Sequence, residues 1–364
     1  ASRCAPVEAI AALSTIADHA GCEGATPAWS IDIGQQGMEF LTTLWLGTPV
    51  WFWLAFLAIV IALTVFDLGV LHKEDRELGV AESLKLSAFY IGVAMLFGAW
   101  VWYARGADLG MKYYTGFFIE KALSIDNVFV ISMIFTYFAI PAKYQYRALL
   151  WGILAVIVLR GIMIALGAAL VEQFYWTLYL FAVFLIATGV KMLVTGEQEM
   201  DVGKNPVVRF MNKHFRVTKE LHGQKFIVKT VDDKTGKVVR AMTPLLVALI
   251  VINIADLIFA VDSVPAIFAI TTDTFIVYTS NIMAILGLRA LYFALAAMVH
   301  RFHYLKYALA MVLVFIGSKI FIADFVLDGE KFPPVLSLGV TMALIAGGII
   351  WSLMKTRGQP VPAE

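Results

Sequence analysis

Two pairs of acidic residues interrupt otherwise apolar stretches of this 364-residue chain. Glu120 and Asp126 are six residues apart, and Asp256 and Asp262 repeat the same spacing. A charge near the centre of a bilayer costs roughly 2.5 to 3.5 kcal/mol on insertion scales, so such residues usually serve a function or a specific pairing. Because carboxylates bind hard divalent cations, the four acids indicate a cation site within a membrane.

Neutral oxygen atoms accompany both acid pairs. Asn127 and Ser263 directly follow the second acid of each pair, and Asn253 lies about one helical turn before Asp256. Pro265 predicts an interruption of its helix, which would free backbone carbonyl groups as further ligands. All six histidines and both cysteines lie outside the cores of the apolar stretches. This set of oxygen ligands favours Mn²⁺, Mg²⁺ or Ca²⁺ over Cu⁺ or Zn²⁺.

The spacing decides which acids can share one ion. Residues six apart on a helix are about 9 Å apart along the axis and roughly 120° apart around it, so one helix cannot readily close both acids on one ion. If the two helices run in opposite directions, Glu120 lies level with Asp262 towards the outer side. Asp126 then lies level with Asp256 towards the inner side. The sequence therefore predicts a two-level metal site with the following candidate ligands: Glu120, Asp126, Asn127, Asn253, Asp256 and Asp262.

Basic residues balance the acids inside the apolar stretches. With Asp67 as a fifth acid, the chain has five bases there: Lys121, Arg160, Lys191, Arg289 and Lys319. Two interpretations stay open for Arg160 and Arg289. They are either counter-cations that a divalent ion or protons displace, or members of permanent salt bridges that set the helix register.

The elements that must position these residues are long apolar helices. The chain is 60% hydrophobic and 15% charged, with a mean hydropathy of +0.81, which excludes an ordinary soluble enzyme. We also see no nucleophile and base at a spacing that suggests an enzyme, and a net charge of +1 does not suggest a nucleic-acid partner. We expect an all-α membrane protein with about nine transmembrane helices, near residues 50–71, 84–104, 110–139, 147–170, 173–195, 242–270, 274–299, 303–325 and 332–353.

An internal repeat relates two groups of three predicted helices. The two acid pairs correspond, Arg160 and Arg289 end similar apolar stretches, and Gly189-Val-Lys parallels Gly317-Ser-Lys. Because each group has an odd number of helices, the two groups must have opposite orientations. The sequence therefore predicts an inverted 3+3 helix repeat, which is typical of secondary transporters.

The repeat divides the chain into six parts. These are an extracytoplasmic tail (1–45), two leading helices (46–108), the first repeat (109–195), a cytoplasmic loop with a β-hairpin (196–241), the second repeat (242–325), and a last helix with a cytoplasmic tail (326–364). The excess of Lys and Arg on one side favours an outer N-terminus and an inner C-terminus, as in a bacterial inner membrane protein. Cys4 and Cys22 share the outer tail, either as a disulfide or as free thiols.

The two acidic motifs carry a family resemblance. Glu120-Lys-Ala-Leu-Ser-Ile-Asp126-Asn127-Val-Phe, together with Asp256-Leu-Ile-Phe-Ala-Val-Asp262-Ser263-Val-Pro265-Ala-Ile, resembles the TerC family of integral membrane proteins, including its Alx branch. The resemblance covers roughly residues 50–355. It implies export of Mn²⁺ in a family named for tellurite resistance, and it places Glu120, Asp126, Asn127, Asp256 and Asp262 on the acidic motif positions.

One position departs from that resemblance. Many relatives have a glutamate where this chain has Asn253, so the predicted inner level carries one charge fewer. The asparagine keeps an oxygen ligand, but the change puts tight divalent binding and proton coupling in question.

The primary hypothesis is a secondary transporter that exports Mn²⁺ across the lipid bilayer. The ion would load at Asp126 and Asp256 and pass to Glu120 and Asp262, with exchange for protons and a homo-oligomeric state left open. Two alternatives remain: a membrane scaffold for the assembly of envelope or secreted proteins, with the acids as ion-pair pins, and direct handling of tellurium oxyanions.

Overall fold

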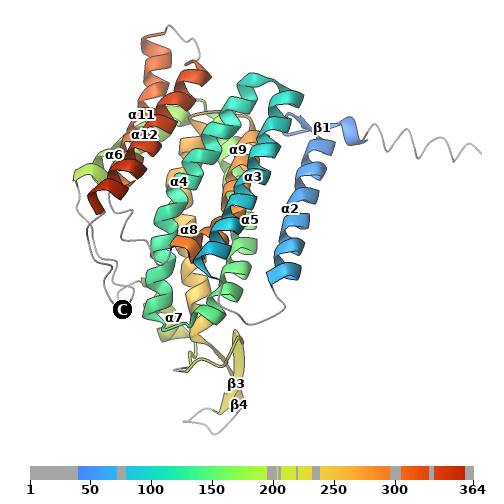
Figure 1. Cartoon of the computed structure of the whole chain (residues 1–364), viewed down its shortest axis with the longest axis vertical. Helices are drawn as coiled ribbons and strands as arrows, with labels where there is room; N and C mark the ends of the chain where they lie inside the picture. Colours follow the sequence, from blue (N-terminus) through green and yellow to red (C-terminus); the bar gives the residue numbers. More distant parts are fainter. Residues whose placement is uncertain are drawn as a thin grey trace, which may run out of the picture. The chain divides into compact units, whose positions relative to one another are not determined.

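A computed structural model describes residues 40–71, 79–194, 203, 206–218, 220–231, 238–295, 305–327 and 332–356 (Figure 1). Cys4 and Cys22 lie outside these residues, so their pairing stays a prediction. Residues up to Val60 and residues from Ile61 onward form two compact units. In the first unit, the short antiparallel strands β1 (Leu44–Trp45) and β2 (Thr48–Pro49) precede the start of helix α2 (Val50–Leu71).

Within the described residues, eight helical segments are long and apolar enough to cross a membrane. They are α2, α3 (Val80–Arg105), α5 (Ala142–Gln173), α6 (Thr177–Val194), α8 (Pro244–Phe268), α9 with α10 (Thr274–Leu286 and Leu288–Leu295), α11 (Leu305–Phe325) and α12 (Pro334–Thr356). Each overlaps one of the predicted spans. The chain is therefore a multi-pass integral membrane protein.

Helix α4 (Ala107–Tyr137) lies at the remaining predicted span. Its 31 residues give a length of about 46 Å at 1.5 Å per residue, which exceeds the thickness of a bilayer core. Its charged residues, Glu120 and Lys121 among them, set it apart from the eight apolar segments. The helix that carries the first acid pair is thus the least apolar of the predicted spans.

In the second unit, helices from the two predicted repeats pack against each other. Helix α5 packs on α8, and α4 packs on α9, while α6 lies along α11 and α12 covers α11 and α4 (Figure 1). The predicted repeat relates α4 to α8, α5 to α9 with α10, and α6 to α11. Under this correspondence the α5–α8 contact is equivalent to the α4–α9 contact. The α6–α11 contact joins two corresponding helices and is equivalent to itself.

The contact between α6 and α11 is reciprocal at two glycines. A Cβ atom added to Gly189 would lie 2.7 Å from the carbonyl oxygen of Ala310, and one added to Gly317 would lie 2.7 Å from that of Ala182. Small residues allow two backbones to approach this closely in a membrane protein. The two glycines of the predicted repeat therefore make equivalent contacts, and each contacts the helix that carries the other.

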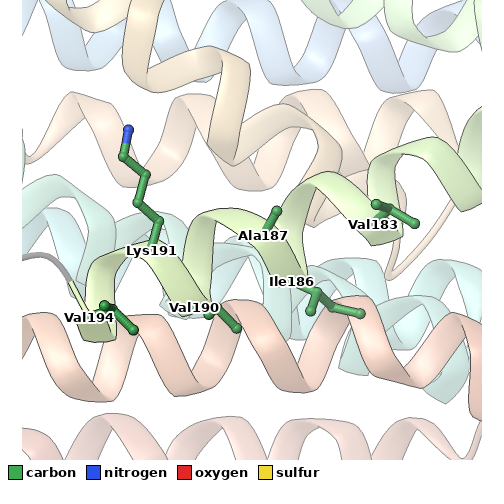
Figure 2. A pocket seen from close by; sticks show the side chains of 6 residues that line it. All are labelled: Val183, Ile186, Ala187, Val190, Lys191 and Val194. Carbon is green, nitrogen blue, oxygen red and sulfur yellow. The ribbon is translucent and has the colours of Figure 1, made fainter.

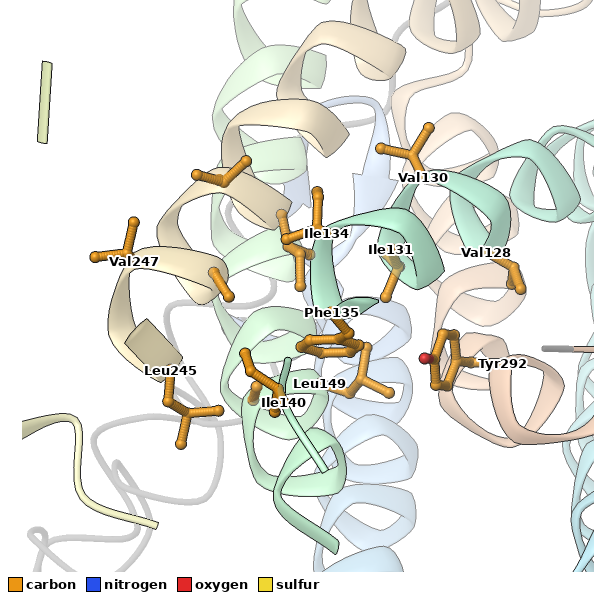
Figure 3. Close-up of a cluster of buried hydrophobic side chains, with 14 of the residues drawn as sticks. Val128, Val130, Ile131, Ile134, Phe135, Ile140, Leu149, Leu245, Val247 and Tyr292 are labelled. Carbon is orange, nitrogen blue, oxygen red and sulfur yellow. The ribbon is translucent and has the colours of Figure 1, made fainter. Parts of the chain in front are cut away.

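Apolar side chains fix the neighbouring ends of α4, α5, α8 and α10. Val128, Ile131, Phe135, Leu149 and Tyr292 belong to this cluster, which Figure 3 shows. The rings of Phe135 and Tyr292 meet edge to face, with centroids 5.8 Å apart. This packing holds in place the segments that carry the polar residues of the acidic motifs.

The prediction that Pro265 interrupts its helix is wrong. Helix α8 continues through Pro265 to Phe268, and the missing N–H of the proline falls in the last turns of that helix. The break lies instead in the next span, where α9 ends at Leu286 and α10 begins at Leu288. The Nζ atom of Lys121 donates to the carbonyl oxygen of Ala284 beside this break, at 3.2 Å.

The predicted hairpin in the loop between α6 and α8 is confirmed. Strands β3 (Ile227–Val231) and β4 (Val238–Met242) pair antiparallel, with Lys229 opposite Arg240. A short helix, α7 (Pro206–His214), precedes them.

Candidate functional site: a buried arginine between two carboxylates

Arg160 is the centre of the polar cluster inside the second unit. Its side chain comes from the middle of α5 and is 1% exposed. Nη2 donates to Oδ1 of Asp256 at 3.0 Å, and Nε donates to Oδ2 of the same carboxylate at 3.2 Å. Nη1 donates to Oε1 of Glu120. One guanidinium therefore joins α4 to α8 through a bidentate and a single charge-assisted contact.

Neutral side chains complete the cluster around the two carboxylates. Asn281 of α9 accepts from Nη1 of Arg160 at 2.6 Å and donates to Oε2 of Glu120 at 3.3 Å. Ser263 accepts from Nη1 at 3.3 Å, and Asn127 donates to Oδ1 of Asp256 at 3.4 Å. Four helices thus contribute to one buried cluster.

The charge of this cluster is not balanced. Glu120 is fully buried and Asp256 is 7% exposed, and with both carboxylates ionised their two negative charges face the one positive charge of Arg160. Burial of an unbalanced charge is costly, so the cluster attracts a further positive charge or a proton.

The predicted pairing of the acids differs from the structure. Glu120 shares its arginine with Asp256, whereas Asp262 faces Thr188 and Lys191 of α6. The depths agree with the expectation, because Asn127 bonds to Asp256 and Ser263 lies with Glu120 at Nη1 of Arg160. Helix direction alone could not show which face of α8 each acid occupies. Asp256 and Asp262 are roughly 120° apart around the helix, so Asp262 turns towards α6, while Arg160 reaches both Glu120 and Asp256.

The six candidate ligands are therefore not assembled around one point. Glu120, Asn127 and Asp256 lie around Arg160, while Asp262 lies apart on the α6 side. The side chain of Asp126 lies outside the described part of the structure. Among the side chains that are described, no three His, Cys, Asp or Glu residues gather closely enough to hold a metal ion.

Asn253 lies one turn before Asp256 on α8. Its Nδ2 donates to the carbonyl oxygen of Leu249 at 2.8 Å, while its Oδ1 is buried without a hydrogen-bond partner among the described residues. Asparagine at this position therefore leaves an unused acceptor on α8, because an asparagine oxygen can accept two hydrogen bonds.

Asp256 lines part of a small cavity. Its volume is about 30 Å³, which is enough to hold a water molecule. Asn127, Asp256 and Leu288 are among its lining residues, and the rest are mainly aliphatic. The cavity lies between the polar cluster and the start of α10.

A larger groove runs along α6, which Figure 2 shows with Lys191 extending away from the helix. The groove is lined by Val183, Ile186, Ala187, Val190, Lys191 and Val194. Its lining is apolar except for the lysine, so it fits hydrocarbon chains better than a hydrated cation.

Sequence reasoning missed the role of Asn281. The Thr279-Ser280-Asn281 run interrupts an apolar helix, and all three side chains are buried, so the run itself was a usable signal. Arg289, which corresponds to Arg160 in the predicted repeat, forms its ion pair with Asp67 instead of the central acids.

The membrane helices and their buried ion pairs define a polytopic integral membrane protein. The family model described as "Integral membrane protein TerC family" matches residues 105–359. The chain belongs to the TerC family.

Related chains match over nearly their whole length. An uncharacterized membrane protein of Rickettsia felis is 47% identical over 303 residues, which cover 83% of this chain and 97% of that protein. One from Myxococcus xanthus is 44% identical over 308 residues, with 85% and 93% coverage. A protein of Escherichia coli named "Putative membrane-bound redox modulator Alx" is 42% identical over 308 residues, with 82% and 92% coverage. No solved structure matches this chain.

Proposed function

We propose that this protein is a secondary transporter that exports divalent cations, chiefly Mn²⁺, from the cytoplasm, and that it is not an enzyme. The observation that carries the proposal is the placement of Arg160 between the buried carboxylates of Glu120 and Asp256. One acid comes from each of the two groups of helices, as a site between moving parts of a transporter requires.

The cluster has the ligands of a hard divalent cation when Arg160 is displaced. Two carboxylates and the side-chain oxygens of Ser263 and Asn281 then face one space, and rotation of the Asn127 amide would bring its oxygen to the same place. Oxygen ligands suit Mn²⁺, and a doubly charged ion neutralises both carboxylates where one guanidinium does not. In this proposal Arg160 and the transported ion compete for the same two acids.

We propose an inverted repeat as the moving frame, with α4 as the ninth transmembrane helix. The reciprocal contacts of Gly189 and Gly317, and the exchange of the α5–α8 and α4–α9 packing, support this arrangement. Rocking of one repeat against the other would open the cluster to each side in turn. The proposed orientation keeps the N-terminus outside and the C-terminus inside a bacterial inner membrane.

The remaining candidate ligands serve the path to and from the centre. Asp126 and Asn253 are proposed for loading from the cytoplasmic side, where the small cavity adjoins Asp256. Asp262 is proposed for release, since it lies apart from the centre and faces α6. Protons would bind the central acids as the metal leaves, which makes exchange for protons part of the proposal.

The experiment is Mn²⁺ flux into proteoliposomes that contain the purified protein. Glu120→Gln and Asp256→Asn are each expected to abolish flux, because each removes a central ligand. Asp324→Asn is the matched control, since this carboxylate lies on α11 and bonds to Tyr179 rather than Arg160. It should transport at the wild-type rate.

Unchanged flux in Glu120→Gln would contradict the proposal. Folded wild-type protein without any flux would favour the scaffold alternative, in which Arg160 forms permanent ion pairs that hold the helices together. Tellurite uptake that survives in Glu120→Gln would instead revive the oxyanion alternative.

A further inference from the structure

Arg289 is held outside the acidic centre by groups from two other helices. It lies on α10, is 2% exposed and forms an ion pair with Asp67 of α2, which is 6% exposed. The ring of Tyr146 on α5 lies 4.1 Å from the guanidinium carbon. The Tyr146 hydroxyl donates to the main-chain oxygen of Asp67 at 3.0 Å, so carboxylate and ring form one holder.

The holder makes the two repeat-related arginines unequal. Arg160 contacts two carboxylates, while Arg289 contacts one that belongs to neither repeat. With both carboxylates ionised, the centre has an excess negative charge that a second arginine could neutralise.

The residue before Arg289 lines the cavity beside the centre. Leu288, its neighbour, lines the same cavity as Asp256. The helix is broken one residue earlier, at Gly287, where an added Cβ would lie 2.9 Å from Nζ of Lys121. A break at this place lets the eight-residue α10 turn without carrying α9 with it.

We propose that Arg289 is a second, exchangeable counter-cation of the acidic centre, and that Asp67 and Tyr146 hold it away in the conformation described. The inference rests on the proposed function. In an inverted repeat the opposite conformation exchanges the roles of the two halves, so Arg289 takes the place that Arg160 holds here. The exchange keeps one guanidinium between Glu120 and Asp256 after the metal has left. Asp67 is then a positioning residue for transport.

The first test is the affinity for Mn²⁺ of the full-length protein in detergent micelles. Asp67→Asn frees Arg289 to compete with the metal, and the dissociation constant should rise about tenfold, or about 1.4 kcal/mol. Adding Arg289→Gln to Asp67→Asn removes the competitor and should restore the wild-type value. Asp273→Asn is the control, because it breaks a different ion pair, with Arg105, and keeps a helix-capping side chain.

The second test does not depend on metal. In a Cys4→Ser, Cys22→Ser background, Ile285→Cys places a thiol in the cavity wall. Asp67→Asn should slow its reaction with a small methanethiosulfonate several-fold, because Arg289 enters the cavity, and Arg289→Gln should restore the rate. If Asp67→Asn does not fold, Tyr146→Leu should act in the same direction by removing the ring from the guanidinium.

The outcomes separate the inference from the proposed function. Equal thiol reactivity and equal Mn²⁺ affinity in all variants would overturn the inference, and so would an equal loss in Asp273→Asn. Wild-type protein that binds no Mn²⁺, but shows the expected changes in thiol reactivity, would refute Mn²⁺ transport and leave Arg289 as the exchangeable group.

Discussion

The reciprocal contact of Gly189 and Gly317 predicts a loss of stability on substitution, and Gly347 provides a matched control. Gly189→Ala and Gly317→Ala each place a methyl group 2.7 Å from a carbonyl oxygen of the partner helix. Ordinary contacts of a Cβ atom begin at 3.4 Å, so the backbones must separate by about 0.7 Å. Since a carbonyl oxygen moves only with its helix, the strain reaches the whole α6–α11 interface.

The expected size follows from two opposing effects. Overpacking of a well-packed contact costs about 1 to 3 kcal/mol. Replacement of glycine by alanine within a helix stabilises it by about 1 kcal/mol. Each variant should therefore lose about 0 to 2 kcal/mol in net stability, while Gly347→Ala, with no atom within 4 Å of the added Cβ, should gain about 1 kcal/mol.

The assay is denaturant unfolding in micelles, followed by tryptophan fluorescence. Both test variants should fall below the control by about 1 to 3 kcal/mol, and by similar amounts. The double variant should lose less than the sum, because one separation of the helices relieves both contacts. If either test variant is as benign as Gly347→Ala, the reciprocal packing is refuted.

Three further predictions concern the acidic centre. Arg160→Gln leaves two buried carboxylates without their cation, and the free energy of unfolding should fall by about 3 to 5 kcal/mol, with Mn²⁺ restoring part of the loss in the same unfolding assay. Asn281→Ala removes one acceptor and one donor, and titration should show about tenfold weaker Mn²⁺ binding; unchanged binding would exclude this residue from the site. Asp262→Asn should bind Mn²⁺ as wild type does but slow its flux, whereas loss of binding would place Asp262 in the centre with Glu120 and Asp256.

Helix positions followed from the sequence because bilayer thickness sets the length of an apolar run. Helix α8 was expected near residues 242–270 and spans Pro244–Phe268, and α11 was expected near 303–325 and spans Leu305–Phe325. The hairpin β3–β4 followed because β-branched residues flank a turn. These features depend on local sequence alone.

The partners of the acids could not be derived in the same way. Glu120 and Asp256 meet because Arg160 of α5 reaches both, whereas Asp262 lies on the face of α8 towards α6. Which acids face one another therefore depends on the packing between helices. The position of the helix break was also not predictable. Pro265 lies in the last turns of α8, where its missing N–H leaves only one carbonyl acceptor unused, so the helix continues, and the break lies at Gly287 instead. Ion pairs within a membrane were predictable as a group, but their individual partners were not.

The most direct measurement is equilibrium binding of Mn²⁺ to the purified protein, followed by the loss of the free-ion signal in electron paramagnetic resonance. Wild-type protein should bind the ion, and the Glu120→Gln, Asp256→Asn double variant should lose that binding while it stays folded. Equal binding by both proteins would contradict the claim that the two carboxylates around Arg160 form the cation site.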